Sequence, residues 1–503
     1  MFKSYTTNDN LLLPPYLGDF ISSNDPVRIV DSIIDRLNIS VLLSQYPGGG
    51  CPSYHPRLML KMIIYAYLRN TYSSRRIEEL GKNDVRFLWL NGMRTPDHNT
   101  INRFRSGRLK GVLKEVFGNI VKFLVEEELV SLDTVYTDGT KIEANANRYT
   151  FVWGKSIQTR VNKIADQINE LWEYAENVTK QELRDSAPVT VAEITPEKVE
   201  EAVEKIQAAL DGVAVDKKVK SKLNRVKKAW PEQLRNYETQ GIILDGRNSY
   251  SKTDNDATFM RMKEDHMKNG QLKPGYNVQL STKDQFILNY SLHSNPTDTT
   301  TYASHMESFH HLYEQYPKVS VADAGYGSEE NYLYAQDKEI QTYIKYNYFH
   351  KEQTKKWKQD PFRSENLFYN PDQDCVYCPM GQKMKKIGEV KRKTVTGFMQ
   401  TSSLYQAQRC EGCPLRGQCH HGKGNRQIQI NHRLRQLKAI EREKLTSEEG
   451  LKHRSKRPCD VEAVFGNLKN NKGFKKFFLR GMQNVEIEVG LLAIAHNIAK
   501  KAA

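Results

Sequence analysis

The segment SLDTVYTD, Ser131–Asp138, predicts a β-strand whose last residue is a carboxylate, and Gly139 breaks the strand directly afterwards. A second segment, KVSVAD at Lys318–Asp323, is short and β-branched, ends in an aspartate and is followed by Gly325. Glycine allows a backbone or a phosphate to approach closely. An isolated Asp-Gly pair is usually an ordinary turn, but two strands that both end in an acid can bring those acids together if the strands are neighbours in one sheet.

Predicted elements on either side of these two strands complete a sheet. They are a hairpin of strands at Tyr276–Leu280 and Gln285–His293, a helix at about Thr299–Tyr313, a strand at Gln341–Tyr346 and, after a charged linker, a helix at about Pro458–Lys469. The predicted fold class is therefore mixed α/β around one sheet, interrupted by two large insertions.

The last predicted helix carries a third acid. Glu462 shares a face with Phe465 and Lys469, three and seven residues further on. Metal-assisted phosphoryl transfer needs hard oxygen ligands for two Mg²⁺ or Mn²⁺ ions roughly 3.5–4 Å apart. A sheet supplies such ligands when acids on adjacent strands meet an acid from a helix packed across them. A lysine two turns from that acid would stand beside a substrate phosphate, although an exposed amphipathic helix with ordinary salt bridges has the same spacing.

The first insertion is predicted to be helical. Ile157–Ala175, Val199–Leu210 and Val219–Trp230 each carry apolar residues at alternating spacings of four and three, which is typical of helices that pack along one stripe. Thr195 and Pro196 suit an N-cap and a first helical position. We expect a helical insertion over about residues 150–250, packed as a hairpin or a small bundle.

The second insertion concentrates cysteine. Five of the seven cysteines lie between Cys375 and Cys419, and two of the pairs, Cys375/Cys378 and Cys410/Cys413, have the spacing of metal-binding knuckles. In a reducing compartment such clustering indicates a structural Zn²⁺ site with four thiolate ligands rather than disulfides. Cys419 or one of the two histidines that follow it could replace one of the four ligands, and free buried thiols are the alternative.

The charge balance of the 503-residue chain indicates a polyanionic partner. Lys plus Arg number 75 and Asp plus Glu 60, an excess of 15, and each cation placed on a phosphate releases condensed counterions. A generic basic protein would have the same balance. No stretch approaches the roughly 20 apolar residues that a membrane helix needs, and the first residues lack the features of a signal peptide. We therefore expect a cytoplasmic protein without a membrane partner.

The first 125 residues are predicted to be mostly helical and to bind DNA. After Pro96 comes a short helix, NTINRFR at Asn99–Arg105. Arg103 and Arg105 in this helix suit phosphate oxygens and base edges. A pair of short helices whose second member carries such residues could form a helix-turn-helix, although many small helical bundles have the same pattern.

Several sequence blocks occur in a characteristic order along almost the whole chain. They are TDGTKIEANAN (Thr137–Asn147), TDNDATFMRMK (Thr253–Lys263), GYNVQL (Gly275–Leu280), VADAGYGSEENY (Val321–Tyr332) and RPCDVEAVFGNLKNNKGFKKFFLRG (Arg457–Gly481), with AHNIAK (Ala495–Lys500) near the end. Together the blocks resemble bacterial insertion-sequence transposases of the DDE superfamily, specifically the insertion-sequence eleven-eighty-two branch.

This resemblance implies a fold, a chemistry and a partner. It implies an RNase H-like catalytic domain over residues 126–503, with the helical insertion at about 150–250 and the cysteine-rich insertion at about 350–450. It implies two Mg²⁺ or Mn²⁺ ions held by Asp138, Asp323 and Glu462, which cut double-stranded DNA at the terminal inverted repeats of the element and transfer the strand to target DNA. We expect a nucleoid-associated homodimer on DNA.

The wider superfamily has a Tyr-x2-Arg-x3-Glu-x6-Lys signature around its last acid. Glu462 and Lys469 fit the signature, but Ser455 stands at the tyrosine position and Pro458 at the arginine position, with Arg457 one residue away. The resemblance therefore predicts Lys469, and less directly Arg457, as DNA contacts.

Two alternatives stay open at this stage. Asp254 and Asp256 are rival acids in one of the shared blocks, and we interpret them as caps of a helix at Thr258–Met267 rather than as metal ligands. The rival function is a catalytically inactive, zinc-containing DNA-binding protein derived from a transposase. The intact set of three acids favours the enzyme.

Overall fold

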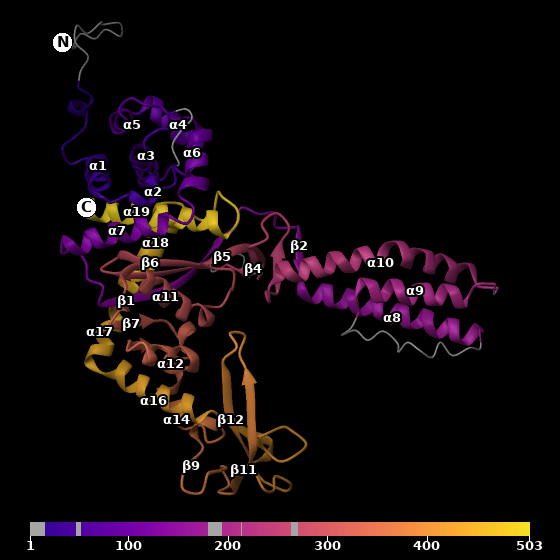
Figure 1. The fold of residues 1–503 in the computed structure, drawn as a ribbon. Helices are drawn as coiled ribbons and strands as arrows, with labels where there is room; N and C mark the ends of the chain where they lie inside the picture. Colours follow the sequence, from indigo (N-terminus) through magenta and orange to yellow (C-terminus); the bar gives the residue numbers. More distant parts are fainter. Residues whose placement is uncertain (1–15, 47–51, 180–193, 213, 263–269) are drawn as a thin grey trace, which may run out of the picture. The chain divides into compact units, whose positions relative to one another are not determined.

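A computed structural model describes residues 16–46, 52–179, 194–212, 214–262 and 270–503 of the protein (Figure 1). The chain divides into two compact units, which are described separately below. The first unit comprises Met1–Thr140, Asn277–Phe478 and Gln483–Ala503, and the second comprises Lys141–Tyr276 and Leu479–Met482. No helix among the described residues is long and apolar enough to cross a membrane.

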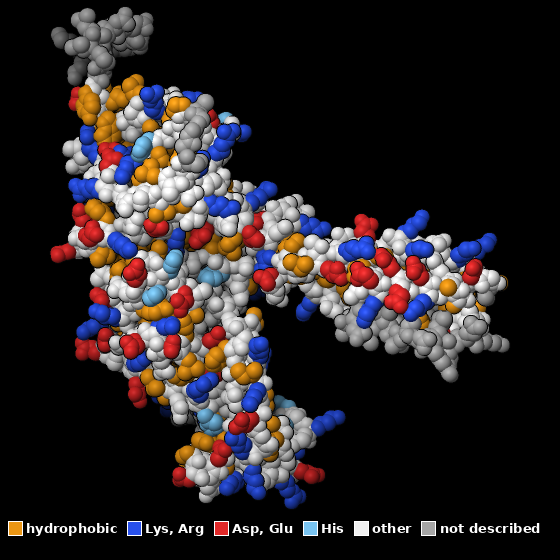
Figure 2. All heavy atoms as spheres, viewed as in Figure 1, with side chains coloured by type: hydrophobic (Ala, Val, Ile, Leu, Met, Phe, Trp, Pro, Cys, Tyr) orange, Lys and Arg blue, Asp and Glu red, His pale blue; other side chains and the backbone are white. Residues whose placement is uncertain are grey.

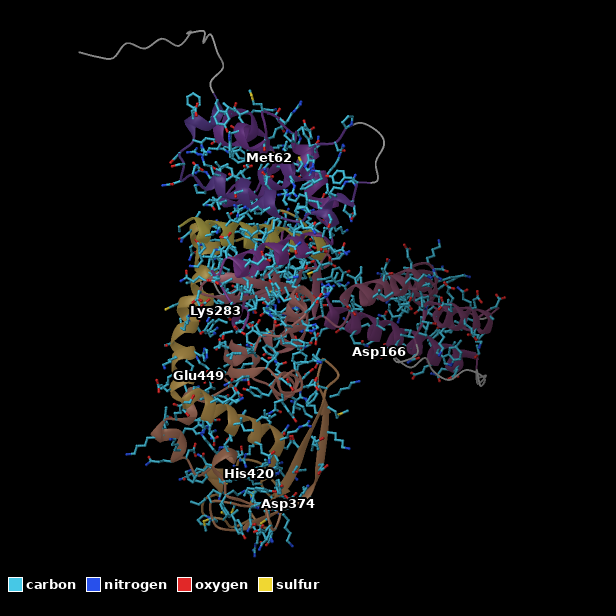
Figure 3. The ribbon with its side chains drawn as sticks, turned by 60° about the vertical axis from the view of Figure 1, so that its left-hand side comes forward. Met62, Asp166, Lys283, Asp374, His420 and Glu449 are labelled. Carbon is cyan, nitrogen blue, oxygen red and sulfur yellow. The ribbon has the colours of Figure 1, made fainter. Side chains whose placement is uncertain are left out.

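The N-terminal part of the first unit is helical, as predicted. Its helices are α1 (Pro26–Arg36), α2 (Ser40–Leu43), α3 (Pro56–Leu68), α4 (Ser74–Asn83), α5 (Val85–Leu90), α6 (His98–Arg103) and α7 (Leu113–Glu126). Helix α3 begins at a proline and is buried along most of its length. The side chain of its Met62 is fully buried (Figure 3). The carboxylate of Asp25 caps α1 through the backbone N–H of Val27 and pairs with Arg86 at 2.7 Å, so it joins α1 to α5.

The central sheet of the first unit has the strand order β6-β5-β1-β7-β8. The strands are β1 (Thr134–Glu143), β5 (Leu272–Lys283), β6 (Phe286–His293), β7 (Val319–Ala322) and β8 (Gln341–Ile344). Strands β1, β7 and β8 are parallel, and β5 is antiparallel to β6. The prediction of a mixed α/β fold is confirmed, and the arrangement is consistent with an RNase H-like transposase.

Helices cover this sheet. They are α11 (Tyr302–Tyr313), α12 (Glu329–Asp337), α16 (His432–Thr446), α17 (Glu448–Arg457), α18 (Ala463–Gly466) and α19 (Met482–Ala502). The buried carboxylate of Glu441 on α16 accepts hydrogen bonds from the hydroxyl of Thr342 and the backbone N–H of Ile344, so it covers the free edge of β8. The prediction of a charged linker before the last acid is wrong, because α16 and α17 fill this region and pack on the sheet.

The cysteine-rich segment of the first unit forms its own antiparallel sheet, in the order β13-β12-β11-β10-β9. The strands are β9 (Tyr369–Asn370), β10 (Cys375–Tyr377), β11 (Lys383–Lys393), β12 (Met399–Gln406) and β13 (Gln427–Ile430). Val376, Met384 and Tyr405 are the centre of a small core. Figure 3 labels Asp374 and His420 in this region, and Asp374 accepts a hydrogen bond from the hydroxyl of Tyr405 at 2.5 Å.

The second unit contains three helices that lie side by side, α8 (Gly154–Thr179), α9 (Pro196–Ala209) and α10 (Lys217–Leu244) (Figure 1). The apolar residues of the three predicted stripes form one core in this unit, which includes Ile168 and Trp230. Thr195 caps α9 by accepting a hydrogen bond from the backbone N–H of Lys198, and Pro196 stands in the first turn. Two short strands, β2 (Phe151–Trp153) and β3 (Ser249–Ser251), pair at the base of the helices.

The helix predicted to begin at Thr258 is wrong over its described part, because Thr258–Arg261 is strand β4 and pairs with Leu272–Gly275 of β5. The remainder of that predicted helix lies outside the described residues. Asp254 is buried and accepts hydrogen bonds from the Tyr276 hydroxyl and the backbone N–H of Gly481, and Asp256 accepts one from the backbone N–H of Met482. These two acids therefore fix a returning chain segment within the second unit instead of capping a helix.

Candidate active site

Parallel pairing of β1 and β7 brings the first two predicted acids together. Thr137 stands opposite Ala322 in the register of the two strands. The next residues, Asp138 and Asp323, therefore lie at neighbouring positions. Gly139 does not end its strand as predicted, because β1 continues to Glu143. The side chain of Asp138 is only 9% exposed, whereas that of Asp323 is 50% exposed, so the cluster has an enclosed side and an open side.

The position after Asp138 requires glycine because the surrounding atoms leave no room for a side chain. A Cβ atom on Gly139 would overlap the amide of Gln279 and lie 2.6 Å from Oδ1 of Asp298. Gly327, which follows Asp323, meets a similar limit, because a Cβ atom there would overlap the backbone oxygen of Lys345. Both glycines therefore serve close packing around the acids.

Glu462 reaches the site from a π-helical turn. The turn comprises Pro458–Glu462 and continues helix α17 into α18. A π-helical turn bonds residues five apart instead of four, so it adds one residue between two side chains that share a face. This explains why Arg457, rather than residue 458, approaches Glu462. Arg457, one residue away from the arginine position of the signature, therefore lies beside Glu462 in the structure.

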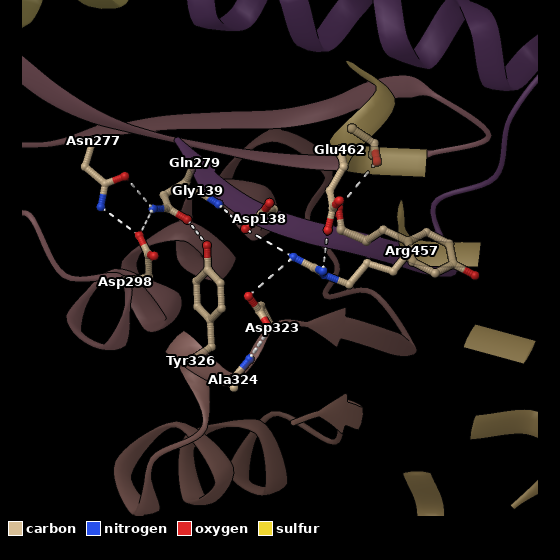
Figure 4. Close-up of polar contacts among 12 residues, drawn as sticks. Asp138, Gly139, Asn277, Gln279, Asp298, Asp323, Ala324, Tyr326, Arg457 and Glu462 are labelled. Atoms are coloured by element: carbon tan, nitrogen blue, oxygen red, sulfur yellow. Dashed lines mark hydrogen bonds and ion pairs between the residues drawn. The ribbon is translucent and has the colours of Figure 1, made fainter. Parts of the chain in front are cut away.

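The guanidinium of Arg457 contacts all three predicted acids (Figure 4). Its Nη2 lies 3.2 Å from Oδ1 of Asp138 and 3.9 Å from Oδ2 of Asp323, and its Nη1 donates a hydrogen bond to Oε1 of Glu462 at 2.9 Å. The arginine side chain is only 6% exposed and that of Glu462 is 51% exposed. Three carboxylates from two strands and a helix therefore converge on one buried cation.

A second polar layer, which the sequence analysis missed, lies beside Asp138 (Figure 4). Oδ1 of Asp298 accepts hydrogen bonds from the side-chain amides of Asn277 at 2.8 Å and Gln279 at 2.9 Å, and the hydroxyl of Tyr326 donates to Oε1 of Gln279. Burial raises the pKa of Tyr326 well above its ordinary value, and the charges of Asp298 and then Asp138 raise it further. Tyr326 therefore remains a protonated donor that holds Gln279 in place.

Lys345 is a further cation that the sequence analysis missed. It follows β8, the third parallel strand, directly. Burial lowers the pKa of Lys345, while the negative charge of Asp323 opposes this shift and Glu462 opposes it more weakly. Lys345 therefore stands within electrostatic reach of the open side of the acid cluster. Its position near the end of the predicted strand Gln341–Tyr346, at the same sheet edge as Asp323, was the available signal.

Asp460 fixes the π-helical turn to the sheet. This buried carboxylate accepts hydrogen bonds from the hydroxyl of Thr282 at 2.6 Å, from the backbone N–H of Asp284 at 2.8 Å and from that of Gln285 at 3.1 Å. The β5–β6 hairpin and the turn that carries Glu462 are thereby joined. No sequence pattern singled out Asp460, because a buried acid two residues before another acid resembles an ordinary helix surface.

The predicted DNA contacts are distributed differently. Arg103 is exposed on α6, whereas Arg105 is buried and its guanidinium donates hydrogen bonds to the hydroxyl of Tyr67 and the backbone oxygen of Tyr72. Lys469 lies in a second π-helical turn, Asn467–Asn471, and is largely buried. Of these three residues, only Arg103 has a freely accessible side chain in this conformation.

Four of the five clustered cysteines share a small cavity. Cys378, Cys410, Cys413 and Cys419 line a space of about 20 Å³. Cys375 lies apart from them in β10, fully buried, with its thiol beside Oε1 of Gln373. Cys375 is therefore not among the residues that line the cavity, whereas Cys419 lines it together with the other three predicted zinc ligands.

Arg426 donates hydrogen bonds to two sulfur atoms of this cavity. Its backbone N–H reaches Sγ of Cys410 at 3.3 Å and its Nη1 reaches Sγ of Cys419 at 2.9 Å. Across the described ranges of the chain, no group of three or more His, Cys, Asp or Glu side chains is arranged closely enough to hold a metal ion. In the acid cluster, the guanidinium of Arg457 stands between the carboxylates.

Comparisons with protein families found two models that match parts of the chain. A model described as a transposase DDE domain matches residues 377–502, and a model described as a transposase domain (DUF772) matches residues 15–107. The first match includes Arg457 and Glu462, and the two together support a DDE-type transposase. Searches of the curated proteins and of the solved structures found no match.

The role of Asp460 predicts a large loss of stability on its removal. Asp460→Ala leaves two backbone N–H groups and a hydroxyl without their acceptor in a buried place, so we expect a loss of about 2–4 kcal/mol in the free energy of unfolding. Asp284→Asn is the matched control, because it removes an exposed ion pair with Lys456 between the same two segments and should cost less than about 1 kcal/mol. Urea unfolding compares the two, and equal losses would contradict the assigned role.

Proposed function

We propose that this protein is a DNA transposase of the insertion-sequence eleven-eighty-two branch. It cleaves DNA strands at the terminal inverted repeats of its element and transfers them to target DNA. The observation that carries the proposal is the convergence of Asp138, Asp323 and Glu462 on Arg457. The family matches support the same class of enzyme, and one of them includes the residues that follow the cysteine sheet.

The three acids fit a divalent metal by their chemistry. Carboxylate oxygens are the ligands that Mg²⁺ and Mn²⁺ prefer, and DDE transposase domains generally use divalent metals. We propose that Asp138, Asp323 and Glu462 hold two such ions, in exchange for the contacts that they make with Arg457. When bound, these ions would supply Lewis-acid activation of the nucleophile and stabilisation of charge on the leaving oxygen.

The remaining residues of the site orient these acids and bind the substrate. Asp138 is held on the enclosed side by its strand and by the layer of Gln279, Asp298 and Tyr326. Asp460 keeps Glu462 against the hairpin. Lys345 on the open side, and Lys469 after a local opening of its turn, would pair with DNA phosphates. Water and later a 3′-hydroxyl are the nucleophiles, so no covalent link between protein and DNA forms.

DNA binding is also proposed for the N-terminal region, residues 1–125. Arg103 on the exposed surface of α6 would contact phosphates or base edges, whereas Arg105 would support that helix from within. The excess of 15 positive charges over the chain favours double-stranded DNA as the partner. We further propose that the protein acts as a homodimer on the element ends.

The proposed chemistry predicts that cleavage and binding separate in one variant. Asp323→Asn should lower Mg²⁺-dependent cleavage of DNA carrying the element ends by at least about 10²-fold, because charge stabilisation in the transition state is lost, while DNA affinity stays the same or rises. The measurement is strand cleavage alongside DNA binding. Asp337→Asn, an exposed acid on α12, is the control and should cut like the wild type.

Two results would contradict this account. If Asp323→Asn cuts as fast as the wild type, the set of three acids is wrong. If the wild type binds its element ends but never cuts them in Mg²⁺ or Mn²⁺, the rival function, a catalytically inactive zinc-containing DNA-binding protein, is supported instead.

A structural Zn²⁺ ion is proposed for the cysteine cluster, with a revised set of ligands. Cys378, Cys410, Cys413 and Cys419 line one cavity, whereas Cys375 does not. The volume of that cavity suits one water-sized particle, and Arg426 donates hydrogen bonds to the sulfur atoms of Cys410 and Cys419. Four thiolates would close the coordination shell, so the ion would stabilise the small sheet and take no part in catalysis.

This revision predicts opposite effects for two cysteine variants. Cys419→Ser should reduce the zinc content of the purified protein well below about one ion per chain and lower its thermal stability, because it removes one of the four ligands that a structural site needs. Cys375→Ser should retain the zinc. Elemental analysis measures the zinc content of both variants and distinguishes the two sets of ligands. A wild type without zinc, or a Cys375→Ser variant that alone loses it, would refute the revised ligand set.

A further inference from the structure

A basic groove lies between helices α8 and α10 of the second unit. It encloses about 480 Å³. Arg160 and Lys163 project into it from α8, and Lys222 and Arg225 from α10. Buried apolar residues of the bundle core lie beneath it, so the cations stand at the margin of an apolar seam. No carboxylate lines the groove.

The positions of the four cations follow from the helix geometry. Each pair is spaced three residues apart, so both members of a pair share one helix face. The ion pair of Lys222 with Glu170, at 2.9 Å, shows that the early part of α10 lies opposite the later part of α8, so the two helices are antiparallel. The cations are therefore arranged along the seam over about ten residues, or roughly 15 Å at 1.5 Å per residue.

Among the described residues, only one of the four groove cations pairs with a carboxylate, because Lys222 lies 2.9 Å from Glu170. Outside the groove, some basic side chains of the bundle pair with acids, as Lys205 does with Glu201 on α9 and Arg235 of α10 with Glu200 of α9, and Figure 2 shows basic and acidic side chains mixed along the bundle on the face it presents. Within the described part of the chain, no ion pair joins Arg160, Lys163 or Arg225 to a carboxylate. The groove thus concentrates positive charge that the protein itself leaves largely unneutralised.

Polar and aromatic groups complete the groove. Gln167 and Gln233 contribute side-chain amides, and Tyr237 contributes a half-buried ring with a hydroxyl. Such groups donate hydrogen bonds to phosphate and sugar oxygens without regard to base sequence. One strand of duplex DNA presents a phosphate every ~3.4 Å of helix axis, so a span of roughly 15 Å brings a few phosphates within reach of the four cations.

We propose that the groove between α8 and α10 binds the sugar–phosphate backbone of duplex DNA, as a contact independent of base sequence. This inference rests on the proposed function, because it supplies a second DNA-binding surface for the same enzyme. The four cations pair with successive phosphates of one strand, and the amides and the tyrosine hydroxyl bind the oxygens between them. The helical insertion thereby contributes its own contact with DNA.

The test compares two double charge reversals in the full-length protein. Lys163→Glu with Arg225→Glu removes two groove cations, one from each helix. Lys155→Glu with Lys228→Glu is the matched control, because both residues are exposed on the same two helices outside the groove and the change in net charge is identical. Lys163→Arg with Arg225→Lys keeps the charge. The probe is a labelled duplex of arbitrary sequence of about 30 base pairs, roughly three helical turns.

We expect the affinity of the groove variant for the duplex to fall by at least about tenfold. We also expect the slope of log affinity against log salt concentration to be shallower by about 1.8, which corresponds to two lost phosphate contacts. The control should change affinity by less than about threefold, since its charges lie away from the backbone, and the charge-conserving variant should bind like the wild type. Equal affinity and slope for the groove and control variants would overturn the proposal. A groove variant that loses affinity for polyglutamate but not for the duplex would also overturn it.

The proposed DNA binding by the groove and the proposed enzymatic function can be disproved separately. A wild type that cleaves its element ends, combined with a groove variant that binds and cuts like the control, overturns only the groove. A wild type that does not bind duplex DNA overturns both.

Discussion

The buried ion cluster around Arg457 is the interaction on which the rest of the central fold depends. Its guanidinium joins Asp138 on β1, Asp323 after β7 and Glu462 in the helical turn that follows α17. Without this cation, carboxylates would face one another in a partly buried place, where mutual repulsion and desolvation both disfavour the charged forms. The sheet and the helical turn are therefore joined by ion pairs at this point, and three carboxylates around one guanidinium leave a negative charge that another cation can balance.

The surroundings of the cluster maintain this geometry. Gly139 leaves room for the layer of Gln279 and Asp298 against β1, while Asp460 attaches the π-helical turn to the β5–β6 hairpin. Gly139 and Asp460 each affect the backbone that carries an acid rather than the side chain of the acid. The proposed exchange of the guanidinium for metal ions would need such rigidity, because the carboxylates would have to keep their positions when the central cation changes.

Much of the architecture could be predicted from the sequence, because it depends on local patterns. The strand before Asp138, the hairpin, the three helical stripes and the cap at Thr195 each follow from periodicity or turn chemistry, and the mixed α/β class follows from their order. The choice of the three acids among sixty acidic residues needed the family resemblance, since each acid alone resembles an ordinary turn or helix residue.

The errors have physical causes that a single sequence does not reveal. The π-helical turn, which brings Arg457 rather than residue 458 to the acids, is a departure from regular helix spacing that tertiary contacts stabilise. Gly139 was interpreted as a strand end, but it is a packing requirement set by residues far along the chain. Thr258–Arg261 forms a strand because a pairing partner is present in β5, and the exposed, lysine-rich β11 lacks the apolar alternation by which strands are recognised.

The central claim is that the acids gathered by Arg457 are the metal ligands of the enzyme. The most direct measurement is the anomalous scattering of Mn²⁺ in crystals of the full-length protein. The account predicts Mn²⁺ peaks bounded by oxygens of Asp138, Asp323 and Glu462, with the guanidinium of Arg457 displaced from at least one of these carboxylates. Crystals soaked in saturating Mn²⁺ that show no peak at this cluster, with all three contacts of Arg457 intact, would contradict it.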